Sequence, residues 1–179
     1  MQSDRDTGTE VIAWNREHCW PKSKGFPAES TYAYNDAHHL RAADKRVNNQ
    51  RNNKDYKNGG SLLCVHPYQS SSCQVDAYQT STTFEVPDKD KGDVARMMFY
   101  MDVRYEGQST KEPDITLVNR VTGSEPYLGY LCDLIQWAKQ DPISSWEKTR
   151  HNKIYEWHLN RNPFVDHPEW IDTLFGSQC

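Results

Sequence analysis

The stretch that decides the fold begins with WNREHCWPKS at residues 14–23 and continues with DAHHLRAADKRVNNQRNNKDY at residues 36–56. Residues 11–20 mix β-branched and aromatic side chains with polar ones, which favours a partly buried strand that Pro21 ends. After a turn-rich loop, residues 33–43 suit a second short extended segment. Asp44 is then a good N-cap for a helix over residues 45–56. We therefore predict strand, loop, strand and helix between residues 11 and 57.

The second half of the chain predicts a mainly helical scaffold. Residues 58–91 are rich in turn formers, with hairpin-like stretches at 61–65 and 77–86. Apolar faces predict two helices, at 92–105 and at 128–138. A capping box of Ser144 with Glu147 predicts the start of a third, and Pro168 lies in the first turn of a short last helix.

The fold class that follows is α+β, with one mainly helical domain spanning residues 1–179. We expect the strand–strand–helix unit at about 11–57, a variable loop and hairpin region at about 58–91, and the helical scaffold at about 92–175. The chain has 179 residues with 36% hydrophobic and 12% aromatic side chains, which suits one core built from few but large side chains. No run approaches the roughly 18 to 20 apolar residues of a membrane span, so we expect no membrane partner.

The charge is unevenly distributed along the chain. The net charge of -4 argues against a partner held by bulk positive charge, such as nucleic acid. Residues 1–60 carry 10 Lys+Arg against 8 Asp+Glu, however, whereas residues 61–179 carry 11 against 17. Residues 41–57 alone hold six basic and two acidic side chains. We therefore expect that a polyanion can still dock on this stretch.

The five cysteines include no CxxC pair; they are Cys19, Cys64, Cys73, Cys132 and Cys179. An odd number fits either a protein with reduced thiols or a secreted protein with disulfides and one spare thiol. Cys64 and Cys73 are spaced to close a small loop, and Cys179 is placed to hold the chain end, so we favour disulfides.

Residues 15–53 hold the densest cluster of functional side chains. Cleavage of a phosphodiester requires a base near neutral pH and a hard cation that neutralises charge on the phosphoryl oxygens. His18 suits the first need, and the oxygen atoms of Glu17 and Asn48 suit the second. Because neighbours on a strand point to opposite faces, Glu17 and His18 share one site only if the strand ends or bends there.

The two quoted stretches resemble the signature of the bacterial endonuclease I and extracellular deoxyribonuclease family, whose active site is a ββα-metal (His-Me) finger. The resemblance continues in VARMMFYMDVRY at 94–105, LIQWAKQDPISSWE at 134–147 and NRNPFVDHPEW at 160–170. It implies that the strand–strand–helix unit is such a finger.

The resemblance also implies roles for matched residues. His18 corresponds to the general base, and Glu17 and Asn48 correspond to the ligands of Mg²⁺, with Mn²⁺ or Ca²⁺ as alternatives. Longer family members carry their phosphate-binding arginine on an insertion that this chain lacks, so we expect Arg41 in that catalytic role, with Arg16 or Arg51 as alternatives. The predicted nucleic-acid contacts come from the strand and helix: Arg16, Lys45, Arg46, Arg51, Asn53 and Lys54.

Two function classes remain open. The first is a Mg²⁺-dependent, largely sequence-nonspecific endonuclease on DNA, with RNA as a further substrate, that leaves 5′-phosphate and 3′-hydroxyl ends. The second is a nucleic-acid-binding module that has lost catalysis on the same scaffold. The presence of Glu17, His18 and Asn48 favours the enzyme. The family further implies a secreted or periplasmic protein, although this chain shows no signal peptide, and we expect a monomer.

Overall fold

The predicted strand–strand–helix unit is present. The computed structural model describes residues 13–65 and 75–179. In it, β1 (Trp14–His18) pairs antiparallel with β2 (Leu40–Asp44), and α2 (Lys45–Arg51) follows directly. Asp44 caps this helix as predicted, because its carboxylate accepts hydrogen bonds from the backbone N–H groups of Arg46 and Val47.

Two boundaries differ from the prediction. The helix α2 ends at Arg51, five residues before the predicted end at residue 56, because Asn52 takes a left-handed backbone conformation with φ of 51°. The extended segment predicted over residues 33–43 is wrong in its first part, where Tyr32–Asn35 form the short helix α1. A tertiary contact holds this turn: the Asp36 carboxylate accepts hydrogen bonds from the hydroxyls of Tyr100 and Tyr105, at 2.7 and 2.8 Å.

The middle of the chain forms a small four-stranded sheet, in agreement with the predicted hairpins. Its strands are β3 (Asp55–Tyr56), β4 (Ser61–Leu62), β5 (Tyr78–Gln79) and β6 (Thr83–Glu85), in the order β3-β6-β5-β4. Two further strand pairs were not predicted and interrupt the helical scaffold: β7 (Glu106–Ser109) with β8 (Glu112–Asp114), and β9 (Thr116–Leu117) with β10 (Tyr127–Leu128).

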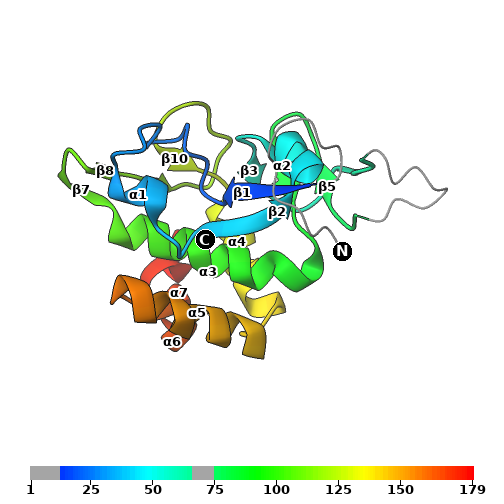
Figure 1. Ribbon diagram of the computed structural model, residues 1–179. Coiled ribbons are helices and arrows are strands. Elements are labelled where there is room, and N and C mark those ends of the chain that lie inside the picture. The colour runs from blue at the N-terminus through cyan, green and yellow to red at the C-terminus, as the bar shows by residue number, and fades with distance from the viewer. Residues whose placement is uncertain (1–12, 66–74) are drawn as a thin grey trace.

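The long helix α3 (Asp88–Arg104) organises the core. It crosses the middle of the molecule, with the strands on one side and the later helices on the other (Figure 1). Residues 91–102 of this helix are buried, which includes Met97, Met98 and Met101 of the predicted apolar face. The other helices are α4 (Leu131–Gln140), α5 (Ser145–His158), α6 (Pro163–Asp166) and α7 (Trp170–Phe175), followed by the 3₁₀ turn η1 (Gly176–Gln178). Among the described residues, each helix is too short or too polar to traverse a lipid bilayer.

The predicted capping box at the start of α5 is half formed. The Ser144 hydroxyl accepts a hydrogen bond from the Glu147 N–H at 3.0 Å, as the box requires. The Glu147 carboxylate instead accepts two hydrogen bonds of 2.7 Å from the buried guanidinium of Arg96 on α3. The second half of the box is therefore replaced by an ion pair that joins α5 to α3.

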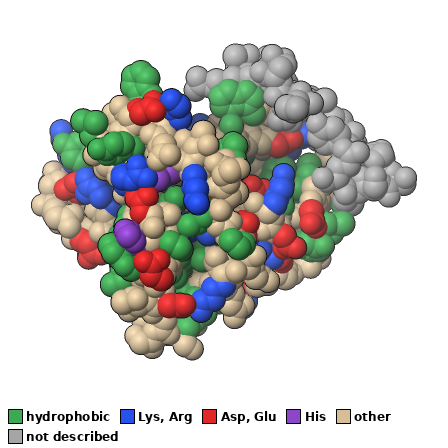
Figure 2. Space-filling view, turned by 90° about the horizontal axis from the view of Figure 1, so that it is seen from below, with side chains coloured by type: hydrophobic (Ala, Val, Ile, Leu, Met, Phe, Trp, Pro, Cys, Tyr) green, Lys and Arg blue, Asp and Glu red, His purple; other side chains and the backbone are tan. Residues whose placement is uncertain are grey.

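A disulfide links Cys132 in α4 to Cys179 at the chain end, which agrees with the prediction that Cys179 holds the tail. Cys19 is a free, buried thiol. Cys64 is also disulfide-bonded, and its predicted partner Cys73 lies outside the described residues. The molecular face seen in Figure 2 carries basic and acidic side chains interspersed rather than one broad charged field.

Candidate active site

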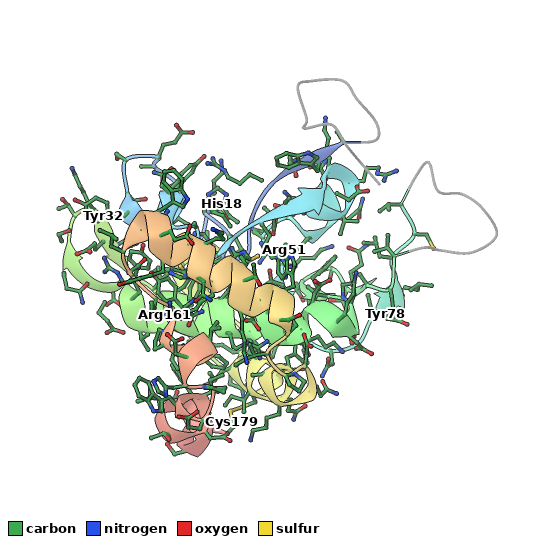
Figure 3. The ribbon with its side chains drawn as sticks, turned by 60° about the horizontal axis from the view of Figure 1, so that its bottom comes forward. His18, Tyr32, Arg51, Tyr78, Arg161 and Cys179 are labelled. Carbon is green, nitrogen blue, oxygen red and sulfur yellow. A yellow bond between two sulfur atoms is a disulfide. The ribbon has the colours of Figure 1, made fainter. Side chains whose placement is uncertain are left out.

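A polar pocket of about 750 Å³ opens where β1 ends. It lies between β1, the loop after it, α1 and α2, and Figure 3 shows His18 and Arg51 near the middle of the molecule, between Tyr32 and Tyr78 at its two ends. The lining residues are Asn15, Arg16, Glu17, His18, Pro21, Lys22, Ser23, Tyr34, Asn48, Asn49, Arg51, Asn52 and Asn53. The pocket thus brings together three residues predicted to do chemistry, namely Glu17, His18 and Asn48.

The imidazole of His18 is held by the backbone of α1. Its Nε2 lies 2.9 Å from the carbonyl oxygen of Tyr34, and the two rings are 4.6 Å apart. Because a carbonyl only accepts, Nε2 carries the proton and Nδ1 is the nitrogen with a lone pair. Burial lowers the pKa of His18 to about 4; the Tyr34 hydrogen bond opposes this shift, and the nearby charges of Arg16, Lys22 and Arg51 add to it. At neutral pH His18 is therefore uncharged and able to accept a proton.

Glu17 is buried against the end of α2. Its Oε1 accepts a hydrogen bond of 3.0 Å from Nη1 of Arg51, and the Arg51 guanidinium also donates to the backbone carbonyls of His18 and Cys19. Burial raises the pKa of Glu17 to about 7, and the charge of Arg51 reduces this shift only in part. Burial opposes the charged form of Arg51 too, but the acidic groups around it, Glu17 among them, leave its pKa raised, so the arginine keeps its charge.

Asn48 lies on α2 and faces the start of β1. Its Nδ2 donates to Oδ1 of Asn15 at 2.8 Å and to the carbonyl oxygen of Arg16 at 3.4 Å. With the amide nitrogen occupied in this way, the amide oxygen is the atom that remains for a cation. Glu17 and Asn48 therefore offer one carboxylate and one amide oxygen to the same pocket.

The end of β1 explains how Glu17 and His18 share this pocket. In the strand ladder Glu17 lies opposite Arg41 and His18 opposite Leu40, so the two side chains leave opposite faces. His18 is the last residue of β1, however, and both residues line the pocket at the strand end. The strand therefore ends where the sequence requires it to end if Glu17 and His18 are to share one site.

The structure does not bring Arg41 to this pocket, contrary to our expectation. Arg41 lies opposite Glu17 in the ladder, so it leaves the face of the sheet that His18 does not use. Its guanidinium is paired with Asp90 and Asp93 on α3, at 3.1 and 3.3 Å. Arg41 is thus committed to two carboxylates on the far side of the strands.

The other predicted nucleic-acid contacts divide into two groups. Arg16, Arg51 and Asn53 line the pocket, but Lys45, Arg46 and Lys54 do not. Arg46 pairs with the capping residue Asp44, and Nζ of Lys54 donates to the backbone of Gln50 at 2.9 Å.

Lys22 and Tyr34 are among the pocket residues that the sequence did not identify. Lys22 lies in the loop after β1, and Tyr34 lies in the helix α1 that was predicted as extended. Neither has a local pattern that identifies it, because each reaches the pocket only through the path of the chain between the two strands.

Comparison with known proteins gives one family and several relatives. Residues 2–169 match the family described as Endonuclease I. The chain is 46% identical over 170 residues to an extracellular ribonuclease of Bacillus amyloliquefaciens and 45% identical to one of Bacillus subtilis, in each case over 94% of this chain and 56% of the relative. It is 25% identical over 160 residues to Endonuclease-1 of Buchnera aphidicola, over 86% of this chain and 58% of the relative. The chain spans a little over half the length of these relatives.

Proposed function

Because the chain belongs to the Endonuclease I family, we propose that it is a metal-dependent endonuclease that hydrolyses phosphodiester bonds in the pocket at the end of β1. The observation that carries this proposal is the convergence of His18, Glu17 and Asn48 on one polar pocket, with Nε2 of His18 held by the Tyr34 carbonyl. The unit that supplies these residues consists of the strands β1 and β2, with the short helix α1 between them, and the helix α2, and this order supports a ββα-metal finger.

The donor set fits a hard divalent cation. Glu17 and Asn48 would hold it through one carboxylate and one amide oxygen, and Mg²⁺ accepts such a set because it keeps several waters. In the described part of the chain there is no cluster of three or more His, Cys, Asp or Glu that could hold a metal. We propose Mg²⁺, with Mn²⁺ or Ca²⁺ as substitutes. When bound, the cation would neutralise charge on the phosphoryl and leaving oxygens.

His18 acts as the general base in this proposal. The Tyr34 carbonyl fixes the tautomer in which Nδ1 is free to take a proton from water, and the neutral imidazole is the form present at neutral pH. Arg51 is a positioning residue, because its guanidinium joins Glu17 to the backbone carbonyl of His18. The expected products carry 5′-phosphate and 3′-hydroxyl ends.

We propose both RNA and DNA as substrates. The names of the Bacillus relatives, extracellular ribonuclease, support RNA as well as the DNA that the sequence led us to expect. Contacts to the phosphate backbone carry no direct sequence information, which suits a largely nonspecific enzyme. The same names, together with the disulfide between Cys132 and Cys179, support a secreted or periplasmic protein. We propose that it acts as a monomer.

A cleavage assay tests the proposal directly. Supercoiled plasmid DNA and a structured RNA are incubated with the protein in Mg²⁺ or in EDTA, with wild type compared with His18→Ala. We expect Mg²⁺-dependent cleavage by wild type and a loss of at least about 100-fold in the variant, the usual contribution of a positioned base. Equal cleavage by the two proteins would refute the role of His18. Binding without cleavage by wild type would instead identify a noncatalytic binding module.

A further inference from the structure

Two basic side chains flank a single aromatic ring in the pocket. Cζ of Arg16 lies 5.1 Å from the centre of the Tyr34 ring, and Nζ of Lys22 lies 5.4 Å from it. Arg16 also donates to the Tyr34 hydroxyl at 3.3 Å. Both cations are exposed and both line the pocket, although one comes from β1 and the other from the following loop.

These two cations differ from the pocket's other charged groups because no carboxylate holds them. Arg51 is paired with Glu17, and Arg41, on the other face, is paired with two aspartates. Within residues 13–65 and 75–179, Arg16 and Lys22 form no ion pair. The hydrogen bond and ring contacts of their side chains are with Tyr34, whose hydroxyl donates to Glu29 at 3.1 Å. Two like charges beside one ring repel each other, so an anion bound between them would be favoured.

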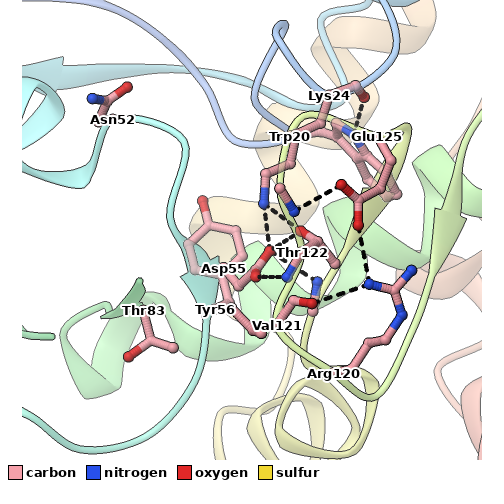
Figure 4. A network of polar contacts seen from close by, with 12 residues as sticks. Trp20, Lys24, Asn52, Asp55, Tyr56, Thr83, Arg120, Val121, Thr122 and Glu125 are labelled. Carbon is pink, nitrogen blue, oxygen red and sulfur yellow. Dashed lines mark hydrogen bonds and ion pairs between the residues drawn. The ribbon is translucent and has the colours of Figure 1, made fainter. Parts of the chain in front are cut away.

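The loop that carries Lys22 is held by buried contacts. The ammonium group of Lys24 is fully buried and pairs with Asp55 at 2.5 Å, and Nε1 of Trp20 donates to the Lys24 carbonyl at 2.8 Å (Figure 4). Gly25 has φ of 116°, and a Cβ there would lie 2.5 Å from Cγ2 of Ile115. Because the loop is fixed on both sides of Lys22, the backbone of Lys22 is held within reach of the Tyr34 ring.

We propose that Arg16 and Lys22 form a phosphate clamp around Tyr34 that binds the backbone of the nucleic acid beside His18. Arg16 leaves the same face of β1 as His18 and lies two residues, or about 7 Å, away along the strand. Arg16 offers a planar fork of donors to phosphate oxygens, whereas Lys22 offers a point charge. The clamp rests on the proposed function, and it takes the place that the sequence led us to give to Arg41.

Binding without cleavage tests the clamp. A fluorescein-labelled oligothymidylate is titrated in EDTA at a series of NaCl concentrations, with wild type, Arg16→Gln, Lys22→Gln and the double variant. Each lost phosphate contact should reduce the slope of log K against log[NaCl] by about 0.7 for a single strand. We therefore expect the slope of the double variant to be reduced by about 1.4. Its thermal unfolding should stay close to that of wild type. The matched control is Lys57→Gln, because Lys57 also lies over a tyrosine ring, with Nζ 4.3 Å from the centre of Tyr130, but does not line the pocket.

The outcomes separate the clamp from the proposed activity. Unchanged slopes in the Arg16 and Lys22 variants would overturn the clamp, and so would an equal reduction in Lys57→Gln, which would reveal only a general loss of positive charge. His18→Ala should retain the wild-type slope. If the Arg16 and Lys22 variants show the expected reductions in slope but wild type does not cleave in Mg²⁺, the hydrolase proposal fails while the clamp stands.

Discussion

Replacing Glu17 by Gln should stabilise the metal-free protein above neutral pH while abolishing cleavage. Glu17 is 8% exposed, its carboxyl group contacts Arg51 at 3.0 Å, and burial raises its pKa from 4.5 to about 7. The raised pKa means that the ionised form is less favourable in the folded protein than in the unfolded chain. Gln keeps an oxygen for Arg51 and has no charge to bury, so it resembles the protonated carboxyl.

The size of this stability difference follows from the difference between the pKa of Glu17 in the folded protein and in the unfolded chain. A folded pKa above the unfolded value gives stability that is fully present below about pH 4.5 and is lost as the pH rises through about 7. At 1.36 kcal/mol per pKa unit, a shift of about 2.5 units costs about 3 kcal/mol at about pH 8. For a domain of this size that difference corresponds to roughly 6 to 12 °C in Tm.

The assay is thermal and urea unfolding of both proteins in EDTA, compared at about pH 4.5 and about pH 8. The stability difference between Glu17→Gln and wild type should grow as the pH rises, and Mg²⁺ should stabilise only wild type. Glu106→Gln is the matched control, because it removes the same charge from an exposed position on β7. A Gln variant that is less stable than wild type at the higher pH would refute the reasoning. It would mean that the ion pair with Arg51 outweighs the burial of the carboxylate.

Three further outcomes can be measured by equilibrium unfolding. The free energy of unfolding of the double variant Cys132→Ser/Cys179→Ser should fall by about 4 kcal/mol, as expected for opening a loop with a sequence separation of 47. A loss below about 1 kcal/mol would show that the disulfide does not restrict the unfolded chain. Asp102→Asn should keep the acceptor for the Leu117 N–H. Its free energy of unfolding should rise by up to about 3 kcal/mol near pH 7, because burial raises the Asp102 pKa to about 6. A gain that does not diminish toward pH 4 would contradict this cause. Asp44→Ala should cost about 1 kcal/mol, with faster amide exchange in the first turn of α2, and unchanged exchange there would argue against the cap.

Local signals predicted the strand–strand–helix unit because each is decided within a few residues. Pro21 limits the first strand, and Asp44 both ends the second strand and caps the helix. Family membership, predicted from the motifs, is confirmed by the match over residues 2–169. The placement of Glu17 and His18 in one pocket followed from the single requirement that the strand end near them.

The direction of Arg41 could not be predicted, because it depends on the register between two strands separated by a long loop. A shift of one residue would exchange the faces of every side chain on β2, and the register that forms places Arg41 opposite Glu17 rather than beside His18. Glu147 illustrates a second limit. Its local pattern is a capping box, but a buried arginine from α3 offers two charged hydrogen bonds, which outweigh the neutral backbone donor.

The negative charge of the whole chain and the positive charge of the pocket act over different distances. The pocket is lined by three basic side chains, Arg16, Lys22 and Arg51, against one carboxylate, Glu17, although the chain carries -4 overall. At physiological ionic strength charges are screened over about 8 Å, so a phosphate in the pocket interacts mainly with these neighbours. At low salt the screening length reaches about 30 Å, and the acidic remainder of the chain then repels the approaching strand. Affinity should therefore level off toward low salt, below the straight line that counterion release from the clamp alone would give.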